Sequence, residues 1–127
     1  MSPKTSNRPK IYIIEDSIIT LDAWLMMLEP DCDVTGFEEP ESFKKLLDEE
    51  SNFLDEVDAV IVDFYFGASD VTGDVVAQWV KAKNPKVCVL LCSEGFSPTE
   101  PMPDGVDRII AKNPVALSWL NLKNSVQ

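Results

Sequence analysis

Three runs of apolar residues, each four to six residues long, stand out along the chain, and none of them alternates with polar positions. Continuous apolar runs of this length are typical of strands that are covered on both faces, as in a parallel sheet. Two weaker strand patterns lie at Asp33–Phe37 and 106–111. The sequence therefore predicts five strands, of which the three strong ones lie at 11–14, 59–62 and 87–92.

Apolar residues recur at helical spacing between these strands. The first stripe begins after Asp16 and ends before Pro30, and its members are Ile18, Leu21, Trp24, Leu25 and Leu28. Similar patterns predict helices at 41–50 and 72–83, and a last helix at 115–124. Strands and helices therefore alternate along most of the chain.

This alternation predicts an α/β domain with one layered parallel sheet and right-handed crossovers. The connection at 95–105 departs from the pattern because it contains three prolines, and no regular helix tolerates them at that spacing. We expect an irregular loop there, with at most one short turn. The 127 residues form one domain of ordinary size, expected over 10–124, and the polar segment 1–9 is expected to be a disordered tail.

The chain is strongly acidic, with 22 Asp and Glu residues against 11 Lys and Arg and a net charge of −11. This charge opposes binding to nucleic acids and to anionic membrane surfaces. Acidic residues are concentrated, with six at 29–41 and another six at 48–58, where there is no Lys or Arg. These segments are either solvated surfaces or a docking surface for a basic partner.

Histidine is absent from the sequence, and there are three cysteines. The absence of histidine excludes a Ser-His-Asp triad, a Cys-His pair and a His-ligated zinc site, and the chain cannot carry a phosphohistidine itself. Cys88 and Cys92 share one predicted strand, about 13 Å apart, which is too far for a disulfide. We therefore expect reduced thiols and a cytoplasmic protein. The apolar runs are far shorter than the ~18 residues that a membrane-spanning helix needs.

Polar side chains follow the predicted strands at the points where the strands end. Glu15 and Asp16 follow the first strand, and Asp63 ends the third. Ser93 follows the fourth strand, and Lys112 comes at the end of the fifth. Because ligands bind outside the carboxyl ends of the strands in an open parallel sheet, we expect these five residues to lie together.

Three carboxylates that lie close together suit a hard divalent cation, and Mg²⁺ prefers oxygen ligands. With Mg²⁺ bound, one carboxylate can still act as a nucleophile, as in aspartyl-phosphate chemistry. Ser93 and Lys112 are donors of the type that a transferred phosphoryl group needs at its oxygens. The sequence therefore indicates a Mg²⁺-dependent site that accepts a phosphoryl group.

Four segments carry a resemblance to a known family, and they are 11–16 (IYIIED), 60–63 (VIVD), 89–93 (VLLCS) and 109–112 (IIAK). In this order and at these strand ends, they resemble the landmarks of response-regulator receiver domains of the CheY-like superfamily, over about residues 10–124. The resemblance implies a flavodoxin-like, doubly wound, five-stranded parallel sheet of order 2-1-3-4-5. In this chain the fourth helix is expected to be degenerate or replaced by a loop.

The resemblance also implies roles for the acidic residues. Asp63 would accept a phosphoryl group from a phosphohistidine of a sensor histidine kinase or a phosphotransfer protein. Asp16, Asp63 and the backbone carbonyl of Tyr65 would bind Mg²⁺, and Glu15 would act mainly through metal-bound water.

Two donors to the phosphoryl group are implied as well. Ser93 would swing towards it on activation, and Lys112 would pair with it. Catalysis would be limited to self-phosphorylation and autodephosphorylation, so no enzymatic activity on a separate substrate is expected. The output would be altered binding to a downstream protein by a monomer or weak dimer, unless the chain is a fragment of a longer regulator.

Several positions depart from the family pattern. Glu94 stands beside Ser93, where a small residue is usual, and its carboxylate would repel a phosphoryl group. The bulky Tyr65 would shield the acyl phosphate from water and slow its hydrolysis. Ile109 replaces the usual switch aromatic. In the family a proline directly follows the lysine, often after a cis bond. Here Asn113 separates Lys112 from Pro114, so that cis bond is not expected.

Two other functions remain open from the sequence. A pseudo-receiver would share the fold and would bind its partners without phosphorylation, which Glu94, Ile109 and the altered 95–105 segment favour. A Mg²⁺-dependent phosphatase would use Asp63 as its nucleophile, but such enzymes often carry a second acid two residues later, where this chain has Tyr65.

Overall fold

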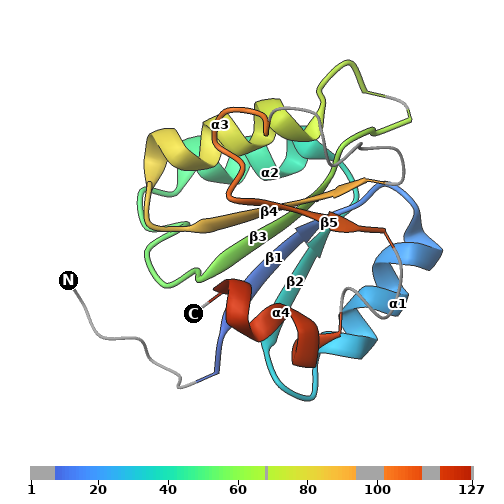
Figure 1. Cartoon of the computed structure of the whole chain (residues 1–127). Helices are drawn as coiled ribbons and strands as arrows, with labels where there is room; N and C mark the ends of the chain where they lie inside the picture. The colour runs from blue at the N-terminus through green and yellow to red at the C-terminus, as the bar shows by residue number, and fades with distance from the viewer. Residues whose placement is uncertain (1–7, 68, 94–101, 113–117, 127) are drawn as a thin grey trace.

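A five-stranded parallel sheet forms the centre of the protein (Figure 1), with the strands in the order β2-β1-β3-β4-β5. The computed structural model describes residues 8–67, 69–93, 102–112 and 118–126. The strands are β1 (Lys10–Ile14), β2 (Asp33–Phe37), β3 (Ala59–Asp63), β4 (Cys88–Ser93) and β5 (Arg108–Ala111). All neighbouring strands in this sheet are parallel, as the continuous apolar runs predict.

Helices cover both faces of the sheet. They are α1 (Ile18–Leu28), α2 (Pro40–Glu49), α3 (Gly73–Lys83) and α4 (Trp119–Val126). α2 and α3 lie on one face, and α1 and α4 lie on the other (Figure 1). The predicted fold class, a flavodoxin-like, doubly wound α/β sheet of order 2-1-3-4-5, is therefore confirmed. Within the described ranges, no helix has both the length and the apolar character that crossing a bilayer requires.

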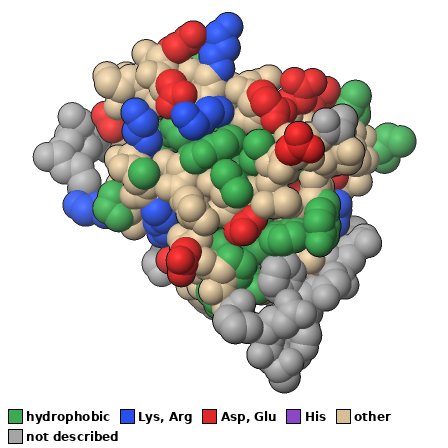
Figure 2. Space-filling model, turned by 90° about the horizontal axis from the view of Figure 1, so that it is seen from above, with side chains coloured by type: hydrophobic (Ala, Val, Ile, Leu, Met, Phe, Trp, Pro, Cys, Tyr) green, Lys and Arg blue, Asp and Glu red, His purple; other side chains and the backbone are tan. Residues whose placement is uncertain are grey.

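An aromatic cluster fills the space between the sheet and α2. Tyr12 of β1 stacks on Phe53 with 4.8 Å between the ring centroids, and Phe37 and Phe43 meet Tyr12 edge on. The Tyr12 hydroxyl donates a hydrogen bond to the Phe53 carbonyl at 3.0 Å, so the buried hydroxyl is satisfied. The cluster holds β1 in place, and the acidic residues of the predicted site follow directly at the end of that strand. The outer surface of α2 and α3 carries acidic and basic side chains side by side (Figure 2).

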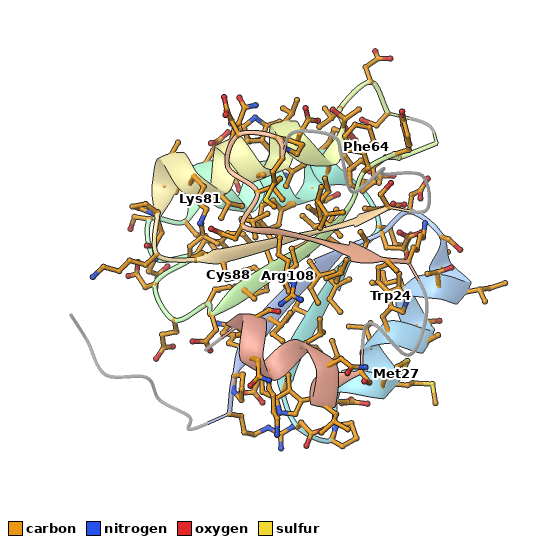
Figure 3. The ribbon with its side chains drawn as sticks, viewed as in Figure 1. Trp24, Met27, Phe64, Lys81, Cys88 and Arg108 are labelled. Carbon is orange, nitrogen blue, oxygen red and sulfur yellow. The ribbon has the colours of Figure 1, made fainter. Side chains whose placement is uncertain are left out.

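The face under α1 and α4 is more aliphatic. Leu21, Trp24 and Leu28 of α1 are buried against it at helical spacing, with Trp24 lying between α1 and the sheet (Figure 3). Ile18 was predicted on the same stripe but is 54% exposed, because it lies in the first turn, beside the edge of the sheet. α1 begins after Ser17, whose hydroxyl oxygen accepts a hydrogen bond from a backbone N–H of the first turn.

Element boundaries shift most near the C-terminus. β5 begins at Arg108, two residues later than predicted, because Val106 closes a turn whose Gly105 has a φ of 86°. α4 extends to Val126, two residues beyond the prediction, and the first residues of the predicted helix, up to 117, lie outside the described part of the chain. The same holds for residues 94–101 of the proline-rich connection, and its described residues form a turn with no regular helix.

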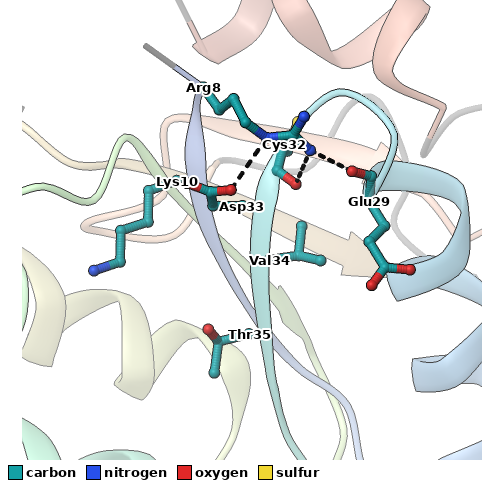
Figure 4. Close-up of a pocket in the computed structure, with 7 residues that line it drawn as sticks. All are labelled: Arg8, Lys10, Glu29, Cys32, Asp33, Val34 and Thr35. Atoms are coloured by element: carbon teal, nitrogen blue, oxygen red, sulfur yellow. Dashed lines mark hydrogen bonds and ion pairs between the residues drawn. The ribbon is translucent and has the colours of Figure 1, made fainter. Parts of the chain in front are cut away.

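The described chain starts within the segment expected to be a tail, and its first residues are bound to the domain. The Pro9 carbonyl accepts a hydrogen bond from the Asp33 N–H at 2.8 Å. The Arg8 guanidinium donates to the Glu29 and Cys32 carbonyls and pairs with Asp33 (Figure 4). A pocket of about 240 Å³ lies beside these groups, at the amino ends of β1 and β2. Because protein groups already bind its guanidinium, Arg8 acts there as a structural clip.

Candidate functional site

The predicted acidic residues meet at the carboxyl edge of the sheet. Glu15 and Asp16 follow β1, and Asp63 is the last residue of β3. Glu15 is fully buried and Asp63 is 5% exposed, whereas Asp16 is exposed. Each of the three offers a carboxylate oxygen within 4.8 Å of the other two. The strand ends therefore bring the carboxylate of Asp63 together with those of Glu15 and Asp16, which lie far from it in the sequence.

One ammonium group bridges two of these carboxylates. The Nζ atom of Lys112, directly after β5, lies 2.8 Å from Asp63 Oδ2 and 3.3 Å from Glu15 Oε1. Burial lowers the pKa of Lys112, but the hydrogen bond and charge of Asp63, together with those of Glu15, outweigh this effect and raise it. Lys112 is therefore a permanent cation at the site.

Glu15 has the most strongly shifted pKa of the carboxylic acids in the described part of the chain. Burial and the neighbouring Asp63 raise its pKa to about 7, although the charge of Lys112 and the Ser17 N–H act in the opposite direction. Glu15 Oε1 accepts hydrogen bonds from both of those groups. Among the described residues, Glu15 Oε2 is the buried side-chain oxygen that has no hydrogen-bond partner. A buried carboxylate oxygen without a donor costs free energy, so the site is incomplete as a purely protein structure.

The donor set fits a hard divalent cation. Three carboxylates face one ammonium, which leaves an excess of negative charge in a largely buried place. The free oxygen of Glu15 is an acceptor that a metal-bound water would satisfy. Mg²⁺ takes oxygen ligands and retains several waters, so two or three carboxylates suit it. The residues present therefore match the predicted Mg²⁺ site, at Glu15, Asp16 and Asp63.

Asp16 accepts a hydrogen bond that the sequence analysis did not identify. Its Oδ2 atom accepts a hydrogen bond of 2.6 Å from the backbone N–H of Gly67, in the loop between β3 and α3. A glycine N–H leaves no recognisable pattern in a single sequence, so nothing in the sequence pointed to this contact.

The start of α3 supports the backbone of Asp63. A Cβ atom on Gly73 would lie 2.4 Å from the Asp63 carbonyl oxygen, so only glycine allows the helix to approach this closely. The Gly73 N–H donates to the Phe64 carbonyl at 2.8 Å, and the Phe64 N–H donates to the Cys92 carbonyl at 3.1 Å. These bonds fix the chain directly after Asp63. The sequence analysis did not identify this role of Gly73. The one signal in the sequence is a glycine at the start of a predicted helix.

Ser93 and Tyr65 lie at the same edge. Ser93 is the last residue of β4 and is half-buried, and it pairs with Ala111 of β5, one residue before Lys112. Tyr65 is 70% exposed, and its ring meets Phe64 edge on at 4.5 Å. The structure thus places Ser93 beside the strand that carries Lys112, while the metal-binding role of the Tyr65 carbonyl stays a prediction.

The other departures from the family pattern divide into two groups. Ile109 packs, partly buried, against the core under α2 and α3, so an aliphatic side chain fills the position of the switch aromatic. Glu94, Asn113 and Pro114 lie outside the described residues.

Solved structures share this architecture, although no family model and no curated protein matches the chain. The chemotaxis response regulator CheY4 of Vibrio cholerae is 16% identical, with a TM-score of 0.76 over 94% of this chain and 99% of that one. A CheY-like response regulator receiver domain protein from Methanospirillum hungatei is 17% identical, with a TM-score of 0.76 over 94% of each chain. A response regulator receiver domain protein from Clostridium thermocellum is 20% identical, with a TM-score of 0.74 over 93% of this chain and 94% of that one. The chain therefore has the receiver-domain fold, as its resemblance to that family implies.

Proposed function

We propose that this protein is a receiver in a two-component phosphorelay and accepts a phosphoryl group on Asp63. One observation carries the proposal: Asp63 lies at the carboxyl edge of a receiver-type sheet, 2.8 Å from the Lys112 ammonium and within 4.8 Å of two further carboxylates. A structural acid at a strand end would need neither the half-buried lysine nor the acidic neighbours. Because Asp63 is 5% exposed, a donor reaches it only by inserting its reactive group at this edge.

The proposed reaction is a phosphoryl transfer from a phosphohistidine of a partner. An Asp63 carboxylate oxygen attacks the phosphorus, and the P–N bond of the donor breaks as the new P–O bond forms. The electron pair of the broken bond stays on the imidazole nitrogen, which is protonated. The product is an acyl phosphate on Asp63 and a regenerated histidine on the partner.

The surrounding residues stabilise the charge of the transferred group. The Lys112 ammonium donates a hydrogen bond to Asp63 and would pair with an oxygen of the phosphoryl group. Ser93 offers a hydroxyl from the neighbouring strand end. Mg²⁺, held by Asp16 and Asp63 with Glu15 behind a bound water, would supply the positive charge that neutralises the phosphoryl oxygens. The backbone carbonyl of Tyr65 is the further ligand that we propose.

The outward face of α1 is the surface that we propose for docking of the donor, a sensor histidine kinase or a phosphotransfer protein. Ile19 is 84% exposed, Met26 is 72% exposed and Ile18 is 54% exposed. Asp22 is the only charged residue of the helix, so its outer face is apolar where a solvated helix would be polar. This face begins next to Asp16 and is therefore adjacent to the site.

The charge around this face specifies the kind of partner. Asp16, Asp22 and Glu29, which precede, lie within and follow α1, are all exposed, and the helix itself contains no Lys or Arg. An apolar helix face with an acidic surround is complementary to a partner patch of apolar residues flanked by Lys or Arg. The acidic surround opposes pairing of α1 with a second copy of itself, so a different protein is the proposed occupant.

The remaining properties follow from the same proposal. The chain acts as a signal carrier and has no separate substrate, and its output is altered binding to a downstream protein. A cytoplasmic location is supported by three free cysteines, Cys32, Cys88 and Cys92.

The competing function is a pseudo-receiver that signals without phosphate. The aliphatic Ile109 packed in the core favours it, because the position has no ring to move on activation.

Intact mass spectrometry tests the proposal. The protein is incubated with phosphoramidate, a small donor with a P–N bond, in the presence and absence of Mg²⁺, beside the Asp63→Asn variant. We expect wild type to gain one phosphoryl group only with Mg²⁺ and the variant to gain none. If wild type binds Mg²⁺ but gains no phosphoryl group, the result favours the pseudo-receiver. The Glu94→Ala variant would then show whether the Glu94 carboxylate blocks the reaction.

A further inference from the structure

Asp16, the exposed member of the carboxylate cluster, is held from across the site. The Gly67 N–H donates to Asp16 Oδ2 at 2.6 Å, between residues 51 positions apart in the chain. A hydrogen bond to an ionised carboxylate is shorter and stronger than one between neutral groups. The bond therefore ties the loop after β1 to the loop after β3, directly beside the site.

Like charges make such a partner necessary for Asp16. The Lys112 ammonium contacts Asp63 and Glu15, and within the described part of the chain no cation pairs with Asp16. Repulsion from the two buried carboxylates favours rotamers that turn Asp16 out into solvent. The Gly67 N–H opposes this rotation, and an oxygen of Asp16 stays within 4.8 Å of the other two carboxylates.

The loop that carries Gly67 is itself anchored. Tyr65 and Thr72 form an antiparallel bridge across it. The Ser69 hydroxyl donates to Glu41 at 2.7 Å, which fastens the loop to the first turn of α2. The Gly67 N–H is therefore aimed at Asp16 by the fold and does not depend on Asp16 for its position.

Glycine also provides the space that the contact needs. A Cβ atom at position 67 would lie 3.2 Å from Asp16 Oδ2, closer than an ordinary carbon–oxygen contact. The single methyl group of alanine would shift the carboxylate by only a few tenths of an ångström and would leave the N–H in place. A proline would remove the donor altogether. These substitutions separate the effect of space from the effect of the hydrogen bond.

We propose that Gly67 is a positioning residue of the cation site, whose backbone N–H fixes the Asp16 carboxylate towards Glu15 and Asp63 and thereby raises the affinity for Mg²⁺. The inference rests on the proposed function, since it takes this cluster to be the one that binds the cation. Hydrogen-bond partners of metal ligands typically contribute 10- to 100-fold to metal affinity. For a single backbone donor we expect an effect at the lower end, about tenfold.

The test compares Mg²⁺ affinity in three forms of the full chain, measured by isothermal titration calorimetry. In the first form a backbone ester replaces the amide at residue 67, so that the N–H is lost without added bulk. The second is Gly67→Pro, which loses the N–H and adds bulk. The third is Gly67→Ala, the matched control, which keeps the N–H. The Gly67 amide proton is followed by NMR in wild type and in Asp16→Asn.

We expect the ester and Gly67→Pro to bind Mg²⁺ about tenfold more weakly, with unfolding midpoints close to that of wild type. Gly67→Ala should stay within about threefold of wild type, and the Gly67 amide proton should resonate downfield and move upfield in Asp16→Asn. An ester form that binds Mg²⁺ within twofold of wild type would overturn the positioning role alone. Wild type that shows no saturable Mg²⁺ binding would overturn the cation site, and with it the proposed function.

Discussion

At the scale of single residues, Glu15 is the carboxylic acid, among the described residues, whose ionisation the fold opposes most. It is fully buried, and burial together with Asp63 raises its pKa to about 7. The folded protein therefore retains a proton that the unfolded chain releases near its ordinary value of 4.5. Because the folded state binds more protons between these two values, the free energy of unfolding falls as the pH rises through that window.

A pH series in EDTA checks this behaviour. Between pH 5.5 and pH 8 we expect the free energy of unfolding to fall by about 2 kcal/mol, since one pKa unit corresponds to about 1.4 kcal/mol. Urea denaturation measures this free energy of unfolding at each pH. Glu15→Gln keeps the shape and cannot ionise, so its pH dependence should be much flatter, and Mg²⁺ should restore the stability of wild type at pH 8. An equal fall in Glu15→Gln would show that another group is responsible.

Adding a single methyl group at Gly73 should displace the backbone of the site. In Gly73→Ala the new Cβ would lie 2.4 Å from the Asp63 carbonyl, so strand and helix must separate. We expect a loss of about 1–3 kcal/mol in the free energy of unfolding and slower phosphorylation by phosphoramidate. Gly36→Ala is the matched control, because the three atoms nearest to its Cβ would all belong to the side chain of Leu21 and none to the backbone at the site. Equal effects of the two substitutions on phosphorylation would refute the role of Gly73.

At the scale of elements, α1 differs from the helices of the opposite face. The outer surface of α2 and α3 carries charged side chains of both signs beside apolar ones (Figure 2). α1 instead presents Ile19 and Met26 to solvent, although Leu21, Trp24 and Leu28 already supply its buried face. The core does not need these two outward residues, and binding of a partner is the role that we propose for them.

Replacing Ile19 and Met26 together by serine should separate docking from chemistry. We expect transfer from a histidine-containing donor protein to slow by about tenfold or more, because buried apolar contacts of an interface each contribute on the order of 1 kcal/mol or more. The rate with phosphoramidate should not change, since a small donor needs no docking surface. Met102→Ser, at another exposed apolar residue, serves as the control. Equal slowing with both donors would contradict the assignment of α1.

At the scale of the whole molecule, the parallel topology creates the site. Glu15 and Lys112 are separated by 97 positions, and their side chains are 3.3 Å apart because strands β1, β3 and β5 end at one edge. This convergence was predictable from sequence, since each strand is an apolar run and each functional residue stands directly at a strand end.

The supporting contacts were not predictable in the same way. Gly67 acts through a backbone N–H, and Gly73 acts through the absence of a side chain, so neither has a chemical signature in a single sequence. The exposure of Ile18 depends on where the first turn of α1 sits relative to the sheet, and helical periodicity does not contain that information. Sequence therefore indicated the side chains that meet at the candidate site, and the structure added the backbone contacts that position them.

The central claim is that Asp63 carries the phosphoryl group, and chemical trapping tests it most directly. After incubation with phosphoramidate and Mg²⁺, borohydride reduces an acyl phosphate of aspartate to homoserine, which peptide mass spectrometry locates. We predict homoserine at position 63 with Mg²⁺ and none when the cation is chelated. Homoserine at another aspartate, the corresponding reduced alcohol at a glutamate, or no reduced residue in protein that binds Mg²⁺ would contradict the assignment.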